Sequence, residues 1–242
     1  MAARTPRQPR RHAGEHDLIA AFGMGGCPVC RLASEAVDAY LTAVCYEQVN
    51  DLDLRAQLRD AGGFCRPHAH RFLRQRLGAL ASAIVYRDVL STARGRIRAR
   101  GPARNGPFGG SAFLGGLLGS RGTRKGAATG GAPNCPACEV LLEAEDRHVG
   151  TLLSRIERPH VLEQYRAGDG LCLPHLDRAF ETEGEPARLI AEAADAKLAE
   201  IVAELDEYVR KHDYRFTDEG LAGSEDVPRR AIERAVGRAD PE

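Results

Sequence analysis

Six of the seven cysteines fall into two copies of one pattern that ends in a histidine. Each copy has a Cys-Pro-x-Cys motif, a long intervening segment and a Cys-x-Pro-His motif. Three thiolates and one imidazole form a four-ligand set of the kind that holds tetrahedral zinc. The predicted metal ligands are Cys27, Cys30, Cys65 and His68 in the first copy and Cys135, Cys138, Cys172 and His175 in the second.

The same ligands are compatible with three kinds of chemistry. Zinc would clamp helix ends together, and two zinc ions per chain are the expectation. An iron–sulfur cluster is the alternative cofactor, because Cys-Pro is common at cluster ligands and a histidine can replace a thiolate. A third hypothesis is a thiol redox sensor or an electron-transfer protein that uses the same cysteines.

Four protein ligands per site favour closed coordination, which argues against an enzyme with an open metal position. The expected role is therefore a non-catalytic interaction or regulatory module with a protein partner that the sequence does not identify. We find no phosphate-binding loop, nucleotide fingerprint or serine nucleophile elbow.

The two copies match beyond the motifs, which indicates an internal duplication. A shift of 108 positions aligns the first halves of the copies, and a shift of 107 aligns the second halves. The matched pairs outside the ligands include Glu35 with Glu143, Asp38 with Asp146, Gly63 with Gly170 and Arg71 with Arg178. The duplication predicts two pseudo-symmetric helical repeats.

Hydrophobic periodicity predicts an all-α fold. Apolar residues recur at three- and four-residue steps after each Cys-Pro-x-Cys motif, so each motif is expected to open a helix. Pro28 and Pro136 then occupy first-turn positions, where a missing N–H costs nothing. The clearest further helices are predicted over residues 79–98 and 186–212, and strand-like alternation is nearly absent.

Chain lengths allow each copy to close on its own metal. A helix from Cys30 to about Asn50 runs about 30 Å outward, and the return to Cys65 spans roughly the same distance if it is part helix and part extended. Each repeat is therefore expected to have its own Cys3His site. A swapped arrangement, in which the Cys-Pro-x-Cys motif of one copy meets the Cys-x-Pro-His motif of the other, stays open.

Composition divides the chain into five segments. Residues 101–133 contain 11 of the 26 glycines and no acidic residue, which is typical of a flexible linker. The expected segments are a disordered basic arm at 1–16, helical metal-binding repeat 1 at 17–100, the Gly-rich linker at 101–133, helical metal-binding repeat 2 at 134–216, and a C-terminal tail with a short helix at 217–242.

The net charge of zero hides a strong asymmetry between the two halves. Residues 1–134 contain 20 basic and 9 acidic residues, and residues 135–242 contain 14 and 25. Because the two charges balance, attraction between the halves is the expectation. The alternative is a nucleic-acid-binding regulator whose basic first half, including Arg94–Arg100, contacts phosphates.

The sequence suggests a cytoplasmic protein with no membrane segment. No stretch approaches the roughly 20 apolar residues of a membrane span, and the basic N-terminus lacks the apolar region of a signal peptide. A reducing cytosol would favour metal-bound thiolates over disulfides.

Several weaker features have structural interpretations. Cys45 lies among apolar residues at helical spacing and is expected in the core. His70 is a possible substitute for His68, but the second copy has Asp177 at that position, which favours His68. The Glu145–His148 segment contains a Glu-x-x-His step, but the first copy does not repeat it, so a solvated helix face is expected.

Cys27-Pro-Val-Cys30, Gly63-Phe-Cys65-Arg-Pro-His68, Leu77–Tyr86 and His212-Asp-Tyr-Arg-Phe216 carry a resemblance. Over most of residues 20–216 the chain resembles an uncharacterised bacterial family with a domain of unknown function and duplicated CPxC/GFCxxH motifs. The resemblance implies a duplicated metal-binding fold unit and supplies no activity. The second copy departs from it at Leu171, where the first copy has Phe64.

Overall fold

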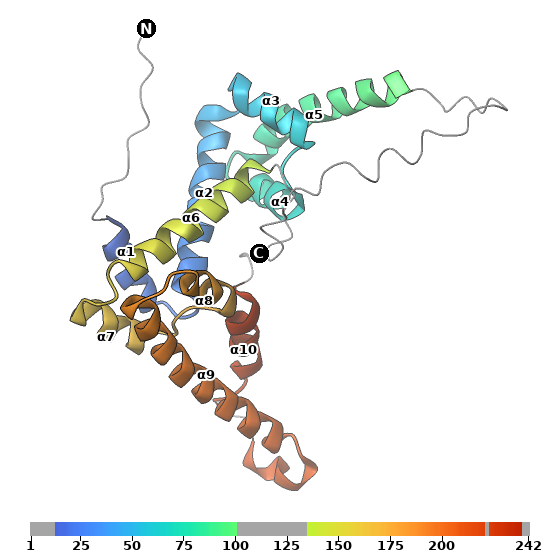
Figure 1. Ribbon diagram of the computed structural model, residues 1–242. Coiled ribbons are helices and arrows are strands. Elements are labelled where there is room, and N and C mark those ends of the chain that lie inside the picture. The colour runs from blue at the N-terminus through green and yellow to red at the C-terminus, as the bar shows by residue number, and fades with distance from the viewer. Residues whose placement is uncertain (1–12, 101–134, 221–222, 239–242) are drawn as a thin grey trace, which may run out of the picture. The chain divides into compact units, whose positions relative to one another are not determined.

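The computed structural model describes residues 13–100, 135–220 and 223–238. Within these ranges every regular element is a helix, which confirms the predicted all-α fold. Most of the predicted arm and the predicted linker lie outside the described residues, while residues 13–16 form the first turn of a helix. The elements are α1 (Ala13–Phe22), α2 (Pro28–Ala43), η1 (Val44–Gln48), α3 (Leu52–Ala61), α4 (Arg66–Arg74), α5 (Gly78–Arg100), α6 (Pro136–Leu153), α7 (Pro159–Ala167), α8 (Leu173–Phe180), α9 (Glu185–Lys211), η2 (Tyr214–Glu219) and α10 (Val227–Val236) (Figure 1).

The chain forms two compact units that do not follow the two sequence copies. Among the described residues, unit 1 comprises those up to Val37 and those from Leu141 onward, and unit 2 comprises those from Asp38 to Val140. The boundaries fall inside α2 and α6, so each of these helices begins in one unit and ends in the other. Each unit therefore contains parts of both copies.

Unit 1 is built around a buried apolar cluster. Helix α1 packs beside α7 (Figure 1), and the rings of Phe22 and Tyr165 meet edge to face with centroids 5.7 Å apart. Helices α8, α9 and α10 contact one another in the same unit. Cys27 and Cys172 belong to this cluster, so packing of the core also fixes two of the predicted ligands.

Unit 2 has a smaller core under α3, α4 and α5. The rings of Phe64 and Phe72 pack at 5.0 Å between centroids, and Leu58 is almost fully buried. Asp51 caps α3 by accepting a hydrogen bond from the Leu54 amide at 2.8 Å. Gly62, with φ +79°, ends the same helix in the left-handed conformation.

The two long helices that periodicity predicts are confirmed as α5 and α9. Their buried faces are narrower than the sequence suggests. On α5, Val85 and Val89 are buried, whereas Leu80 and Leu90 are exposed. Among the described residues, no helix combines the length and the apolar character needed to cross a membrane.

Candidate metal centres

Four helix N-termini present the predicted ligands. Cys65 and Cys172 are the N-cap residues of α4 and α8, with a proline in the first turn of each helix. Cys27 and Cys135 directly precede Pro28 and Pro136, the first residues of α2 and α6. The positive end of a helix dipole stabilises thiolate, the form that binds metal. The motif thus places its sulfurs near the positive ends of helix dipoles.

In unit 1, four side chains converge at the starts of α2 and α8. Nδ1 of His175 lies 3.4 Å from Sγ of Cys27, 3.5 Å from Sγ of Cys30 and 3.1 Å from Sγ of Cys172. The sulfurs of Cys30 and Cys172 are 3.6 Å apart. We call Cys27, Cys30, Cys172 and His175 site 1.

In unit 2, the equivalent group forms at the starts of α4 and α6. Nδ1 of His68 lies 3.1 Å from Sγ of Cys65, 3.4 Å from Sγ of Cys138 and 3.7 Å from Sγ of Cys135. The sulfurs of Cys65 and Cys138 are 3.5 Å apart. We call Cys65, His68, Cys135 and Cys138 site 2.

All eight residues selected from the sequence therefore lie in two groups of four. The expected assignment of the motifs to these groups is wrong. Each site combines the Cys-Pro-x-Cys motif of one copy with the Cys-x-Pro-His motif of the other. This is the swapped arrangement that the spacing left open. Closure of each copy on itself is not observed.

An ion pair inside the first copy accompanies the swapped arrangement. Arg71, one turn after His68, is buried and donates through Nε to Asp38 Oδ1 at 2.7 Å. Asp38 lies about 12 Å further along α2 than Cys30, at 1.5 Å per helical residue. The helix that follows the Cys65–His68 turn is therefore tied to the part of α2 that belongs to unit 2.

The second copy repeats this contact. Arg178, one turn after His175, pairs with Asp146, which lies about 12 Å along α6 from Cys138. The equivalent Asp and Arg residues were visible as matches between the copies, but the sequence did not show that they touch. The pair is therefore present in both copies, once in each unit.

The thiols of each site differ strongly in acidity. At site 2, hydrogen bonding from Cys138 lowers the pKa of Cys135 to about 3, and the contact with Cys135 raises the pKa of Cys138. At site 1, burial opposes ionisation of Cys27, but hydrogen bonds from Cys172 and Cys30 outweigh it and lower the pKa. The contacts with Cys172 and Cys27 raise the pKa of Cys30. Thiols packed this closely ionise together only when a cation compensates their charge.

The donor spacing fits one tetrahedral ion in each site. Zn–S bonds of about 2.3 Å and Zn–N bonds of about 2.0–2.1 Å place two sulfurs about 3.8 Å apart and a sulfur and a nitrogen about 3.6 Å apart. The S–S distances quoted above are 3.5 and 3.6 Å, and the S–N distances run from 3.1 to 3.7 Å. Cys30 and Cys138 are half-buried, and the other cysteines of both sites are buried.

Glycine is required in the turn that precedes each Cys-x-Pro-His motif. Gly63 and Gly170 have φ values of +104° and +74°, in the region that side chains other than glycine rarely adopt. A Cβ on Gly63 would lie 2.8 Å from Cε1 of Tyr86, whereas one on Gly62 would meet nothing within 4 Å. The tight turn lets Cys65 reach the start of α6.

Gly63→Ala is expected to destabilise unit 2 by about 2–4 kcal/mol, because it combines a strained φ with an overpacked contact. The matched control is Gly62→Ala, which has a positive φ but open space and should cost about 1–2 kcal/mol. Urea unfolding followed by circular dichroism measures both. Equal effects of the two substitutions would show that the approach to Tyr86 is unimportant.

The Glu145–His148 segment is only in part the solvated face expected from the sequence, because Asp146 and Arg147 are exposed but Glu145 and His148 are buried. Glu145 is 6% exposed and His148 is 8% exposed. Oε1 of Glu145 lies 3.4 Å from Nε2 of His175, on the side of the imidazole opposite to the sulfurs. Comparison of the copies hid this residue, because the shift of 108 aligns Glu145 with Val37.

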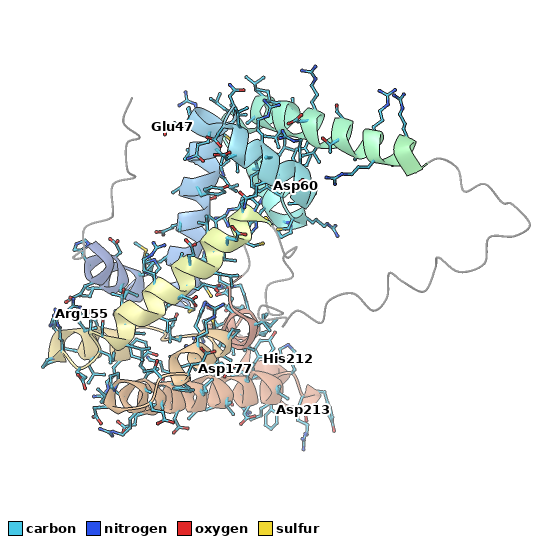
Figure 2. All side chains as sticks on the ribbon, turned by 45° about the horizontal axis from the view of Figure 1, so that its top comes forward. Glu47, Asp60, Arg155, Asp177, His212 and Asp213 are labelled. Carbon is cyan, nitrogen blue, oxygen red and sulfur yellow. The ribbon has the colours of Figure 1, made fainter. Side chains whose placement is uncertain are left out.

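The alternative ligand and the spare thiol stay outside both sites. His70 is exposed on α4. Its counterpart on α8 is Asp177, which is labelled in Figure 2 and is exposed as well. Cys45 is buried in η1 and belongs to neither group, as expected for a core residue.

The sequence also gave no sign that the C-terminal segment reaches site 1. Gly237 follows α10 with φ +87°, and a Cβ there would lie 3.3 Å from Sγ of Cys30. Arg234 of α10 donates to the Leu171 carbonyl at 2.9 Å, next to the ligand Cys172. The end of α10 therefore covers one side of site 1.

The chain matches the model of a family of unknown function (DUF6062) over residues 20–242. It belongs to that family. This confirms the resemblance drawn from the duplicated motifs. A stretch of 73 residues is also 40% identical to the "Uncharacterized 23.9 kDa protein in xynA 3'region" of Caldicellulosiruptor sp. (strain Rt8B.4). That stretch covers 30% of this chain and 35% of the relative. No solved structure matches the chain.

Proposed function

We propose that this member of the family is a non-catalytic zinc protein, in which two mononuclear Cys3His sites fix the helix starts of an interaction or regulatory module. The observation that carries the proposal is the donor geometry. In each site three sulfurs and one imidazole nitrogen lie within 4.8 Å of one another, and a single ion would satisfy all four.

The spacing favours zinc over an iron–sulfur cluster. The four ligands of a cluster are divided among at least two irons, so all four donor atoms cannot lie as close together as the donors of one ion. In each site all four donor atoms lie within 4.8 Å of one another. The three-thiolate composition favours zinc over harder divalent ions, and it suits the reducing cytoplasm that we propose as the compartment.

Closed coordination supports a non-catalytic role. A cavity of about 300 Å³ adjoins Cys27 and Cys172 of site 1. Two of the arginines that line it are paired, since Arg229 contacts Glu233 at 2.7 Å and Arg230 contacts Asp226 at 3.3 Å. A molecule in the cavity would have to displace a protein ligand to reach the metal.

Anaerobically purified protein is expected to be colourless and to contain two zinc ions per chain, because each complete donor set holds one ion. Elemental analysis and the absorption spectrum between 300 and 500 nm, run on the same sample, measure this. Iron with sulfide and a brown colour would overturn the zinc assignment. A metal-free protein with unchanged helix content would overturn the proposal as a whole.

A further inference from the structure

The imidazole of His175 is held from both sides. Its Nδ1 faces the three sulfurs of site 1, and its Nε2 faces the carboxylate of Glu145 at 3.4 Å. When Nδ1 binds a metal, Nε2 carries the proton and can donate it to that carboxylate. A carboxylate behind a ligating histidine fixes the ring orientation and strengthens the histidine as a ligand.

Glu145 is itself supported in this position. Its side chain is 8% exposed, and Oε2 lies 3.0 Å from Nη2 of Arg178. The arginine compensates the buried charge and also pairs with Asp146, the next residue of α6. Glu145, Arg178 and His175 therefore form one connected group around site 1.

Site 2 has the same ligand set and the same neighbouring ion pair. Arg71 pairs with Asp38, as Arg178 pairs with Asp146. The residue that aligns with Glu145 is Val37, which cannot accept a hydrogen bond. Within the described parts of the chain, Nε2 of His68 has neither an ion-pair nor a hydrogen-bond partner. The two sites thus have the same ligand types, but the carboxylate behind the histidine is present at site 1 and is not seen at site 2 among the described residues.

We propose that Glu145 is a positioning residue that makes site 1 the tighter of the two metal sites, so that site 2 releases or exchanges its metal first. The inference rests on the proposed metal binding and adds the order in which the two sites lose their metal. Loss of such a carboxylate typically weakens metal binding about 10- to 100-fold. The two sites of one chain are expected to differ by a factor of this size.

The test uses the full chain loaded with ¹¹³Cd²⁺, whose nuclear magnetic resonance spectrum should show one signal for each site. Cys138→Ser assigns the signal of site 2 by removing it. In a chelator titration of the wild-type protein, the concentration of free chelator that empties site 2 should then be about 10- to 100-fold lower than the concentration that empties site 1.

Two substitutions at Glu145 separate its role from general stability. Glu145→Gln keeps the shape and removes the charge, and Glu145→Val installs the residue that the other copy contains. Each should shift the loss of the site 1 signal toward that of site 2 and leave site 2 unchanged. Arg178 would keep Asp146, just as Arg71 has Asp38, so both variants should fold.

Asp146→Asn is the matched control, because Asp146 shares Arg178 with Glu145 but is exposed. It should leave the order of metal loss unchanged. Three results would overturn the inference: equal loss from both sites in the wild-type protein, an unchanged gap between the two losses in both Glu145 variants, or the same narrowing of the gap in Asp146→Asn. A chain that binds no cadmium at all would instead overturn the proposed metal binding, on which the inference depends.

Discussion

Removal of metal from both sites is expected to abolish cooperative folding of the chain. A structural zinc ion contributes about 10–16 kcal/mol of apparent binding free energy in small zinc-binding peptides. A typical domain has a total stability of about 5–15 kcal/mol. The binding free energy lost with two such ions should therefore exceed the free energy of unfolding that the apolar cores provide without metal.

The lengths of the helices indicate how much helical structure the metal-free protein would lose. Helix α4 has 9 residues and α8 has 8, which is too short for a helix to persist alone in water. Helix α9, with 27 residues, can retain part of its structure. The metal-free protein should lose its cooperative thermal transition, much of its helical circular dichroism and its resistance to protease.

The measurement is thermal unfolding before and after treatment with a strong chelator, with stoichiometric zinc added back as the control. Zinc should restore the transition. A chelated protein that unfolds within a few degrees of the untreated one would show that the two cores fold without metal and that the sites are accessory.

The ligands and their helices could be predicted from the sequence because both depend on short-range patterns. Cysteine and histidine three residues apart, with proline between them, indicate a helix start, and apolar periodicity extends that helix. The duplication then distinguished His68 from the neighbouring His70. These arguments need only local spacing, and the structure places all eight residues at such helix starts.

The pairing of the motifs is a matter of tertiary structure, which spacing along the chain does not encode. Chain lengths permitted Cys65 to meet either Cys30 or Cys138. The structure has the second arrangement, and Arg71 pairs with Asp38 on α2, a contact between residues 33 positions apart. Glu145 was missed for a related reason. Comparison of the copies selects what they share, and this carboxylate is a difference between them.

The pairing is also the most direct test of the account, because two double substitutions give opposite results under the two arrangements. Cys27→Ser with Cys172→Ser removes two ligands from site 1 and leaves site 2 complete. Cys27→Ser with Cys65→Ser removes one ligand from each site, although both cysteines belong to the first sequence copy.

The measurement is tightly bound zinc per chain after dialysis against a chelator that does not strip the wild-type protein. The swapped arrangement predicts about one zinc ion in Cys27→Ser/Cys172→Ser and almost none in Cys27→Ser/Cys65→Ser, because only complete four-ligand sites should survive the dialysis. The opposite result, with almost none in the first variant and one in the second, would contradict the account and show that each copy closes on its own metal.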